Sequence, residues 1–412
     1  DWAMTAFSIG FSTALSAETA AAELAHGVLE AFGGEAPAGG LLWATAAAGM
    51  DGFRIGHRLL ERWPDAVLAG TSFEGLLLGG RAYRGEPAVG LISWTSGDRA
   101  PSPFLVESEL FAPAGRHPGE GLAESVARAI LEETGREGLA DDDLLLLFPD
   151  AHGPGDAEIW LRALIARLGG TAVAGAAASG PGGGACPSWI FDERHPGALV
   201  GLLLPGAGGG GRPPIGSSGA SRRASPWLQI DRCRGRWIDL LDGEPPADWI
   251  RRQLGLLPTD PIEPHLDRLL ARLSAAPSDD ERSASFEPDP RDYGERFVVG
   301  LDAHSGAISL PVETRRGQRL AFALPDAAQA RDRLRETLQG LPDSRALLQL
   351  ACRSRDESLH GDLDLEHALV SSEVSTAATI GTLGPFQLGP GPGGVPSVLV
   401  HATVLVPLGD QP

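Results

Sequence analysis

Three stretches of the chain repeat the same order of apolar and polar segments. Each begins with a short apolar run, continues with a segment whose apolar positions recur at helical spacing, and returns to a second apolar run. The first runs and their helical segments are LLWATA with FRIGHRLLERW, LLLLF with AEIWLRALIARLGG, and ALLQLAC with DLEHALVSSEV. About thirty residues separate the start of each unit from its end, which is typical of a strand–helix–strand unit. We therefore predict three such units.

A glycine ends the second apolar run of each unit, in AVLAG, TAVAG and ATIG. These residues are Gly70, Gly175 and Gly381. We expect each to close a strand where the chain turns sharply or approaches another backbone, because glycine has no Cβ atom. The loop after Gly175 is glycine-rich, but it runs into further strands rather than the helix N-terminus that a phosphate site needs. A phosphate site is therefore not expected there.

Further strands and single helices surround these units. This favours an α+β or mixed α/β fold, with two related domains of mixed β-sheets flanked by helices. A stretch rich in glycine, proline and serine separates the two halves. We predict an N-terminal domain over 1–204, a linker over 205–226 and a C-terminal domain over 227–412. Within the C-terminal domain, the polar segment 274–294 is predicted to be a mobile insert.

The composition excludes several partners and chemistries. The formal net charge is −20 and the pI is about 4.9, so nucleic acid and anionic membranes are not expected as partners. All 34 basic residues are arginine, which excludes a P-loop lysine and a Schiff-base lysine. The three cysteines have no metal-ligand spacing. Because no apolar run reaches membrane-spanning length, we expect a cytoplasmic protein.

Several segments resemble, in order and spacing, those of the FIST family, named for F-box and intracellular signal transduction proteins. The resemblance covers nearly the whole chain. In the N-terminal half it lies in SIGFSTALSAETAAAELA, AVLAGTSFEGLLL, TAVAGAAASG and WIFDERHPGALVGLLL. In the C-terminal half it lies in RPPIGSSGASRRASPWLQ, VGLDAHSGAISLPVETRRGQRLAFAL, ALLQLACRSR and VLVHATVLVPL. The two halves are thus similar to the FIST N and FIST C domains.

The resemblance implies a non-catalytic sensory module that binds a small ligand, such as an amino acid or a related metabolite. Members are often fused to signalling domains, so a kinase or a cyclase is an expected partner. The family usually carries a Gly-Glu pair after each corresponding loop. Here the first site reads Glu74-Gly75 and the second reads Gly384-Pro385. Because both pairs differ from the family pattern, the resemblance implies that this protein binds a different ligand or has lost ligand binding.

The candidate ligand-binding residues follow the predicted strand ends. They are Gly70, Thr71, Ser72, Glu74, Gly175, Ser179, Cys352, Arg353, Gly381 and Gly384. The hydroxyls and the carboxylate after Gly70 could bind a polar ligand, or could satisfy a tight turn. Arg353 could hold a ligand carboxylate through two hydrogen bonds, or form a surface salt bridge. We expect the pocket to be lined by the loops after Gly70 and Gly381.

Three alternatives stay open. Some bacterial FIST members are reported to bind haem and sense nitric oxide, so a histidine could serve as an axial ligand. The histidines considered are His26, His57, His117, His195, His304 and His401. A second alternative is a protein-interaction adaptor, as in eukaryotic relatives. The third is a cysteine hydrolase that uses Cys352 with His360 or His367 and Asp362. Apart from haem, no cofactor or metal is expected.

Overall fold

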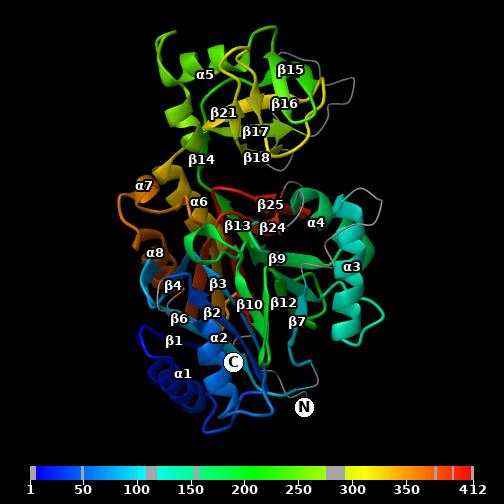
Figure 1. Cartoon of the computed structure of the whole chain (residues 1–412), viewed down its shortest axis with the longest axis vertical. Coiled ribbons are helices and arrows are strands. Elements are labelled where there is room, and N and C mark those ends of the chain that lie inside the picture. The colour runs from blue at the N-terminus through cyan, green and yellow to red at the C-terminus, as the bar shows by residue number, and fades with distance from the viewer. Residues whose placement is uncertain are drawn as a thin grey trace.

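The computed structural model confirms an α+β protein with several mixed β-sheets and repeated strand–helix–strand units. It describes residues 6–47, 51–97, 99–107, 118–152, 157–274, 293–374, 378–391 and 394–409. The chain forms a body of three sheets and an upper unit with a fourth sheet (Figure 1). Within the described ranges, no helix is both long enough and apolar enough to cross a membrane.

Three successive repeats of one design build the body. The first repeat contains β1 (Phe7–Ser12), α1 (Ala17–Ala31), β2 (Gly39–Thr45), α2 (Gly52–Leu60), β3 (Val67–Phe73), the hairpin β4 (Gly75–Leu78) and β5 (Arg81–Arg84), and β6 (Val89–Trp94). The second contains β7 (Ser102–Val106), α3 (Pro118–Glu133), β8 (Leu144–Phe148), α4 (Ala157–Leu168), β9 (Ala172–Ala176), the hairpin β10 (Pro187–Ile190) and β11 (Glu193–Pro196), and β12 (Leu199–Leu204).

The third repeat follows the same order but carries the upper unit as an insertion. It begins with β13 (Gly216–Gly219) and resumes with α6 (Ala327–Gln339) and β22 (Ala346–Cys352). It continues with α7 (Glu357–His360), α8 (Leu365–Glu373), β23 (Ala378–Gly384), the hairpin β24 (Gln387–Pro390) and β25 (Pro396–Leu399), and β26 (Ala402–Leu408). The upper unit therefore lies between the first strand and the first helix of this repeat.

Each predicted strand–helix–strand unit forms a parallel strand pair, namely β2 with β3, β8 with β9 and β22 with β23. The hairpin of each repeat joins the sheet of another repeat. Strand β4 pairs with β23, β10 pairs with β3, and β24 pairs with β9. The sheets therefore share one strand order: β1-β6-β2-β3-β10-β11, β7-β12-β8-β9-β24-β25 and β13-β26-β22-β23-β4-β5. This exchange locks the three repeats together.

Successive side chains of a strand point to opposite faces of the sheet, and in each of the three sheets of the body both faces are buried. One face of every sheet contributes to a common core, which includes Trp43, Phe148 and Leu348. The opposite face is covered by two helices from the same repeat: α1 and α2, α3 and α4, or α6 and α8. Leu42 and Leu145, for example, point to these outer helix layers. The core is therefore shared by segments far apart in the sequence.

The upper unit has a core of its own. It contains β14 (Ser221–Arg223), β15 (Leu228–Arg234), β16 (Trp237–Leu241), α5 (Pro246–Leu254), β17 (Leu270–Ser274), β18 (Tyr293–Phe297), β19 (Gly300–Leu301), β20 (Ile308–Ser309) and β21 (Arg319–Pro325). Strand β21 lies centrally and pairs with β14, β15 and β17. Phe322 and Ile238 are among its fully buried residues.

The predicted domain boundaries do not match this arrangement. Strands β4 and β9 from 1–204 pair with β23 and β24 from 227–412, so the two ranges do not form separate sheets. The predicted linker 205–226 contains β13 and β14, which are ordered by pairing with β26 and β21. Of the predicted insert 274–294, residues 275–292 lie outside the described residues.

The three repeated glycines lie within strands and do not end them. In the parallel pairs, Gly70 faces Leu42, Gly175 faces Leu147 and Gly381 faces Gln349. A Cβ atom would lie 1.9 Å from the Leu147 carbonyl oxygen at Gly175, and 2.2 Å from that of Gln349 at Gly381. Of the two expected reasons for a glycine, close backbone approach is therefore confirmed, whereas a sharp turn at the end of the strand is wrong.

Candidate functional site

A cleft of about 990 Å³ lies between the upper unit and the body, chiefly the third repeat of the body. Its upper wall is mainly apolar. The residues of this wall include Leu266, Phe297, Val299, Val312 and Leu324. Its lower wall is formed by the residues that follow β22, by the loop after β23 and by the connection between β25 and β26. The upper wall also carries Arg236, Arg268 and Arg296, so both walls combine apolar and charged side chains.

Among the described residues, five arginines and two carboxylates line the cleft. The arginines are Arg84, Arg236, Arg268, Arg296 and Arg353, and the carboxylates are Glu158 and Asp356. The chain as a whole carries a formal charge of −20. The excess of arginines over carboxylates in the cleft lining is therefore opposite in sign to the net charge of the chain. Such a cleft attracts small anions and favours their entry over that of cations.

Arg296 connects the two sides of the cleft. It lies on β18 of the upper unit, and its guanidinium forms an ion pair of 2.9 Å with Glu158 on α4 of the body. The same side chain donates a hydrogen bond to the Val398 carbonyl at 3.2 Å, while the Val398 amide donates to Glu158 at 3.1 Å. One largely buried arginine thus ties the upper unit to the second and third repeats of the body.

Glu74 does not line the cleft itself, but it binds two of the arginines that do. It accepts hydrogen bonds from Arg84 and from Arg353, the latter at 3.0 Å. Arg84 also bonds Asp356 at 2.7 Å. Burial acts to raise the pKa of Glu74, but Arg353 and Arg84 outweigh it and lower the pKa below its ordinary value. Glu74 is therefore ionised at neutral pH, and Arg353, whose side chain is 53% exposed, could exchange this partner for a ligand.

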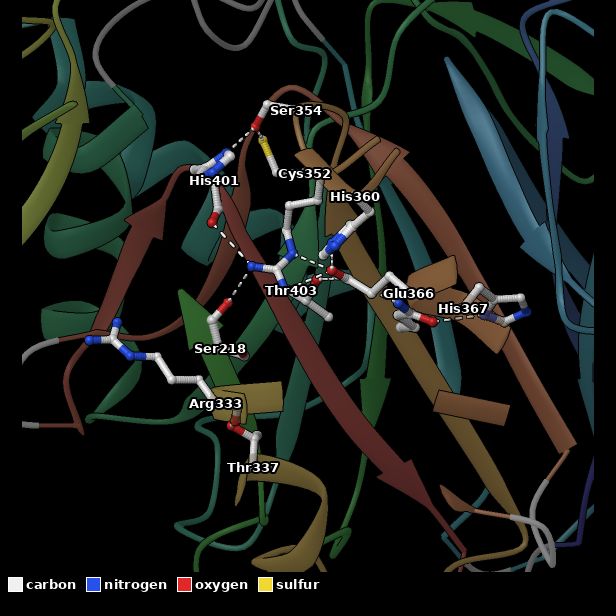
Figure 2. A network of polar contacts seen from close by, with 12 residues as sticks. Ser218, Arg333, Thr337, Cys352, Ser354, His360, Glu366, His367, His401 and Thr403 are labelled. Atoms are coloured by element: carbon white, nitrogen blue, oxygen red, sulfur yellow. Dashed lines mark hydrogen bonds and ion pairs between the residues drawn. The ribbon is translucent and has the colours of Figure 1, made fainter. Parts of the chain in front are cut away.

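A cysteine, a serine and a histidine meet at the lower wall. The Ser354 hydroxyl lies 3.1 Å from the Cys352 sulfur and 2.8 Å from Nδ1 of His401 (Figure 2). Cys352 ends β22, whereas His401 lies in the two-residue connection between β25 and β26. His401 has a φ of 52°, a left-handed conformation that is costly for a residue other than glycine. The fold thus holds this histidine in a strained position.

His401 is neutral at physiological pH. Burial and then the charge of Arg355 lower its pKa from 6.5 to about 4. The Ser354 hydroxyl donates its one proton to the Cys352 sulfur, so Nδ1 of His401 donates to the Ser354 oxygen in this arrangement. The Nε2 atom of His401 is buried and has no hydrogen-bond partner among the described atoms.

A buried ionic network supports this corner from below (Figure 2). Glu366, fully buried, accepts hydrogen bonds from Arg355 at 2.7 Å, from His360 at 3.0 Å and from Thr403 at 2.5 Å. Arg355 also donates to the His401 carbonyl at 3.4 Å. Burial alone would raise the pKa of Glu366, but Arg355, His360 and Thr403 lower it to about 2. The network therefore fixes the backbone beside His401.

The structure divides the predicted ligand-binding residues into three groups. Cys352 and Arg353 line the cleft, and Glu74 contacts Arg353. The hydroxyls of Thr71, Ser72 and Ser179 lie inside the body instead. Thr71 contacts the Ser188 hydroxyl at 3.2 Å, and Ser72 donates to the Ser179 carbonyl at 2.7 Å.

The glycines among the predicted residues also lie away from the cleft lining. Gly70, Gly175 and Gly381 are strand positions, and Gly384 ends β23 against the Ala177 backbone. The structure therefore brings only one of the two predicted loops to this cleft. Pro385 and Phe386, after Gly381, line the cleft, whereas the residues directly after Gly70 do not.

The histidines expected to serve Cys352 lie elsewhere. His360 contacts Glu366, and His367 contacts Gln349 at 2.7 Å. Asp362 accepts a hydrogen bond from the Asp364 amide at the surface. The histidine that lies near Cys352 and Ser354 is His401, which the sequence analysis considers only as a haem ligand. His117 lies outside the described residues. Ser354, Arg296 and Glu158 were missed, because no local pattern marks residues that meet across a cleft.

Comparison with known proteins identifies the family. The FIST N domain model matches residues 38–244. An uncharacterized protein of Mycobacterium tuberculosis, Rv0628c in strain H37Rv and MT0656 in strain CDC 1551, is 26% identical over 393 residues, which are 93% of this chain and 94% of that protein.

Solved structures give weaker likenesses. A cyanuric acid hydrolase from A. caulinodans aligns with a TM-score of 0.35 and 11% identity over 99% of this chain and all of that one. A chorismatase aligns with a TM-score of 0.35 and 13% identity over 98% of this chain and all of that one. Such low TM-scores carry no argument about fold or function. The family model covers half of the chain, and on this basis the chain belongs to the FIST family.

Proposed function

We propose that the protein is a non-catalytic sensor that binds a small anionic molecule, an amino acid or a related metabolite, in the cleft between the upper unit and the body. One observation carries this proposal: a strongly acidic chain gathers five arginines around a single cleft. Membership of a family named for signal transduction supports it. A ligand held between two units can stabilise one arrangement of these units over another. This shift in arrangement would signal to a partner protein that the ligand is bound.

The two walls indicate what such a ligand carries. A carboxylate would bind Arg353, whose guanidinium is exposed and already bonded to the carboxylate of Glu74. An apolar group would pack on the upper wall, where Val299 is 58% exposed. The ligand would therefore touch both units at once. A signalling protein such as a kinase or cyclase would read the resulting arrangement.

Thermal shift and calorimetry against amino acids and small carboxylic acids test this function. We expect an apolar acid to raise the melting temperature, since a ligand at 100 times its Kd adds about 2.7 kcal/mol to the free energy of unfolding. The matching amide should bind at least about tenfold more weakly, and Arg353→Gln should weaken the acid by a similar factor. Arg58→Gln is the matched control and should leave binding unchanged, because Arg58 on α2 is bonded to Glu61 and does not line the cleft.

Two results would count against the proposal. If the acid and its amide bind equally well, the arginines do not select an anion. If no compound in a broad screen shifts the melting temperature, a protein-interaction adaptor becomes the better description of the chain.

Haem binding is a second candidate, favoured by the buried and unpartnered Nε2 of His401. His401 would hold the haem iron, and cleft arginines such as Arg353 would pair with the propionates. Bound haem would supply an iron centre for a diatomic gas. Titration with haem should then give a Soret band that His401→Asn abolishes; asparagine is chosen because it tolerates a positive φ. No band in the wild-type protein rejects this candidate.

A further inference from the structure

The positive charges of the cleft are paired unevenly between its two walls. Arg84 bonds the lining carboxylate of Asp356 at 2.7 Å, and Arg296 bonds that of Glu158 at 2.9 Å. Both of these carboxylates belong to the body, so no carboxylate of the upper unit is among the described residues that line the cleft. The three arginines of the upper wall therefore give this wall a surplus of positive charge.

Arg268 is the clearest part of this surplus. It ends the 3₁₀ helix η3 (Glu263–Arg268), lines the cleft, is exposed, and forms no ion pair with any described residue. The next residue, Leu269, is fully buried, and its carbonyl accepts the Val298 amide at 3.1 Å. The backbone that carries Arg268 is thus fixed to the core of the upper unit. A guanidinium held in this way, without a counter-ion, is suited to bind a carboxylate.

Arg353 offers a second accessible guanidinium, on the opposite wall. Its side chain is 53% exposed, and its partner Glu74 is shared with Arg84. Glu74 would therefore keep a cation if Arg353 turned to a ligand. Apolar residues such as Val299 line the same cleft. One accessible arginine thus stands on each unit, with apolar surface in the cleft that both line.

We propose that Arg268 and Arg353 bind the two ends of one ligand, a small dicarboxylate whose apolar chain packs on the upper wall. The proposal rests on the proposed function, because one carboxylate would occupy the arginine site named there. It adds a second anion site, on the upper unit, and narrows the ligand from an anion to a dianion. Each end would form a charge-assisted contact with a different unit, so the ligand would favour the arrangement in which both contacts are made.

The test uses straight-chain dicarboxylates from butanedioate to nonanedioate, each compared with the monocarboxylate of the same chain length. Calorimetry on the full chain should show one length at which the diacid binds at least about tenfold more tightly than its monoacid, since it gains a second charge-assisted contact. Affinity should pass through a maximum with length, because both carboxylates must reach their arginines at once.

Substitutions assign the second contact. Arg268→Gln should lower the affinity of the best diacid to that of its monoacid and leave the monoacid unaffected, whereas Arg353→Gln should weaken both. Arg316→Gln is the matched control and should change neither affinity. Arg316 is also an exposed arginine of the upper unit without an ion pair to a described residue, but it does not line the cleft.

The outcomes separate this proposal from the function on which it rests. If no diacid of the series binds more tightly than its monoacid, the two-ended ligand is overturned while anion sensing stands. If Arg268→Gln leaves the affinity of the best diacid unchanged, the second carboxylate does not bind there and the proposal is equally overturned. If neither kind of acid binds the wild-type protein, both proposals fall.

Discussion

Arg355→Met is expected to lower the free energy of unfolding by about 3–5 kcal/mol, because it leaves the fully buried Glu366 carboxylate without its cation. The side chains of Arg355 and Glu366 are 0% and 6% exposed, so water cannot replace the lost partner. Arg355 also holds the Ser218 and His401 carbonyls at 3.3 and 3.4 Å, and both would lose a donor. Urea unfolding followed by tryptophan fluorescence measures the change.

An exposed arginine provides the control for this result. Arg167→Met removes an ion pair with Glu124 whose side chains are 46% and 50% exposed, and should cost less than about 1 kcal/mol. The double variant Arg355→Met with Glu366→Met should recover part of the loss, since it removes the unpaired charge as well. Equal effects of Arg355→Met and Arg167→Met would show that the buried network does not stabilise the fold.

Acid titration provides an independent check on the same ion pair. The pKa of Glu366 is about 2 in the folded protein and 4.5 as a reference for the unfolded chain. Since the folded value is the lower one, this stabilisation is present above pH 4.5 and is lost as the pH falls from about 4.5 to about 2. In Arg355→Met the folded pKa should rise, and this part of the pH dependence should flatten.

The repeat design could be predicted from the sequence, but the way the repeats combine could not. Apolar runs such as LLLLF and helical spacing such as that of AEIWLRALIARL are local signals, and each correctly indicated a strand or a helix. The exchange of hairpins is not local. The hairpin over 75–84 is not predicted from the sequence, and nothing in this segment specifies that β4 pairs with β23 of the third repeat. A boundary drawn between halves therefore crosses two sheets.

In the candidate site, too, the local features could be predicted from the sequence and the contacts between distant segments could not. Cys352 and Arg353 could be predicted as site residues because they end an apolar run, where side chains emerge from a sheet. Their partners Ser354 and His401 are 47 residues apart, and only the pairing of β22 with β26 brings them together. The hydroxyls after Gly70 were misplaced because β3 continues to Phe73, which puts Thr71 and Ser72 inside the body.

Gly175→Ala and Gly381→Ala are expected to destabilise the protein by about 2–3 kcal/mol or more each, because the new Cβ atom would collide with a backbone carbonyl and not with a side chain that could move. In both parallel pairs the collision is with the residue directly opposite, Leu147 or Gln349. Relief requires the two strands to separate, which weakens their hydrogen bonds and loosens the shared core. Urea unfolding of each variant measures the loss.

Gly27→Ala is the matched control, since Gly27 lies within α1 and a Cβ atom there meets nothing within 4 Å. Alanine favours a helix, so this change should raise the free energy of unfolding by about 0.5–1 kcal/mol. The opposite signs separate steric exclusion from a general intolerance of substitution. If Gly175→Ala or Gly381→Ala proved as stable as the wild type, close approach of the paired strands would not be the reason for the repeated glycine.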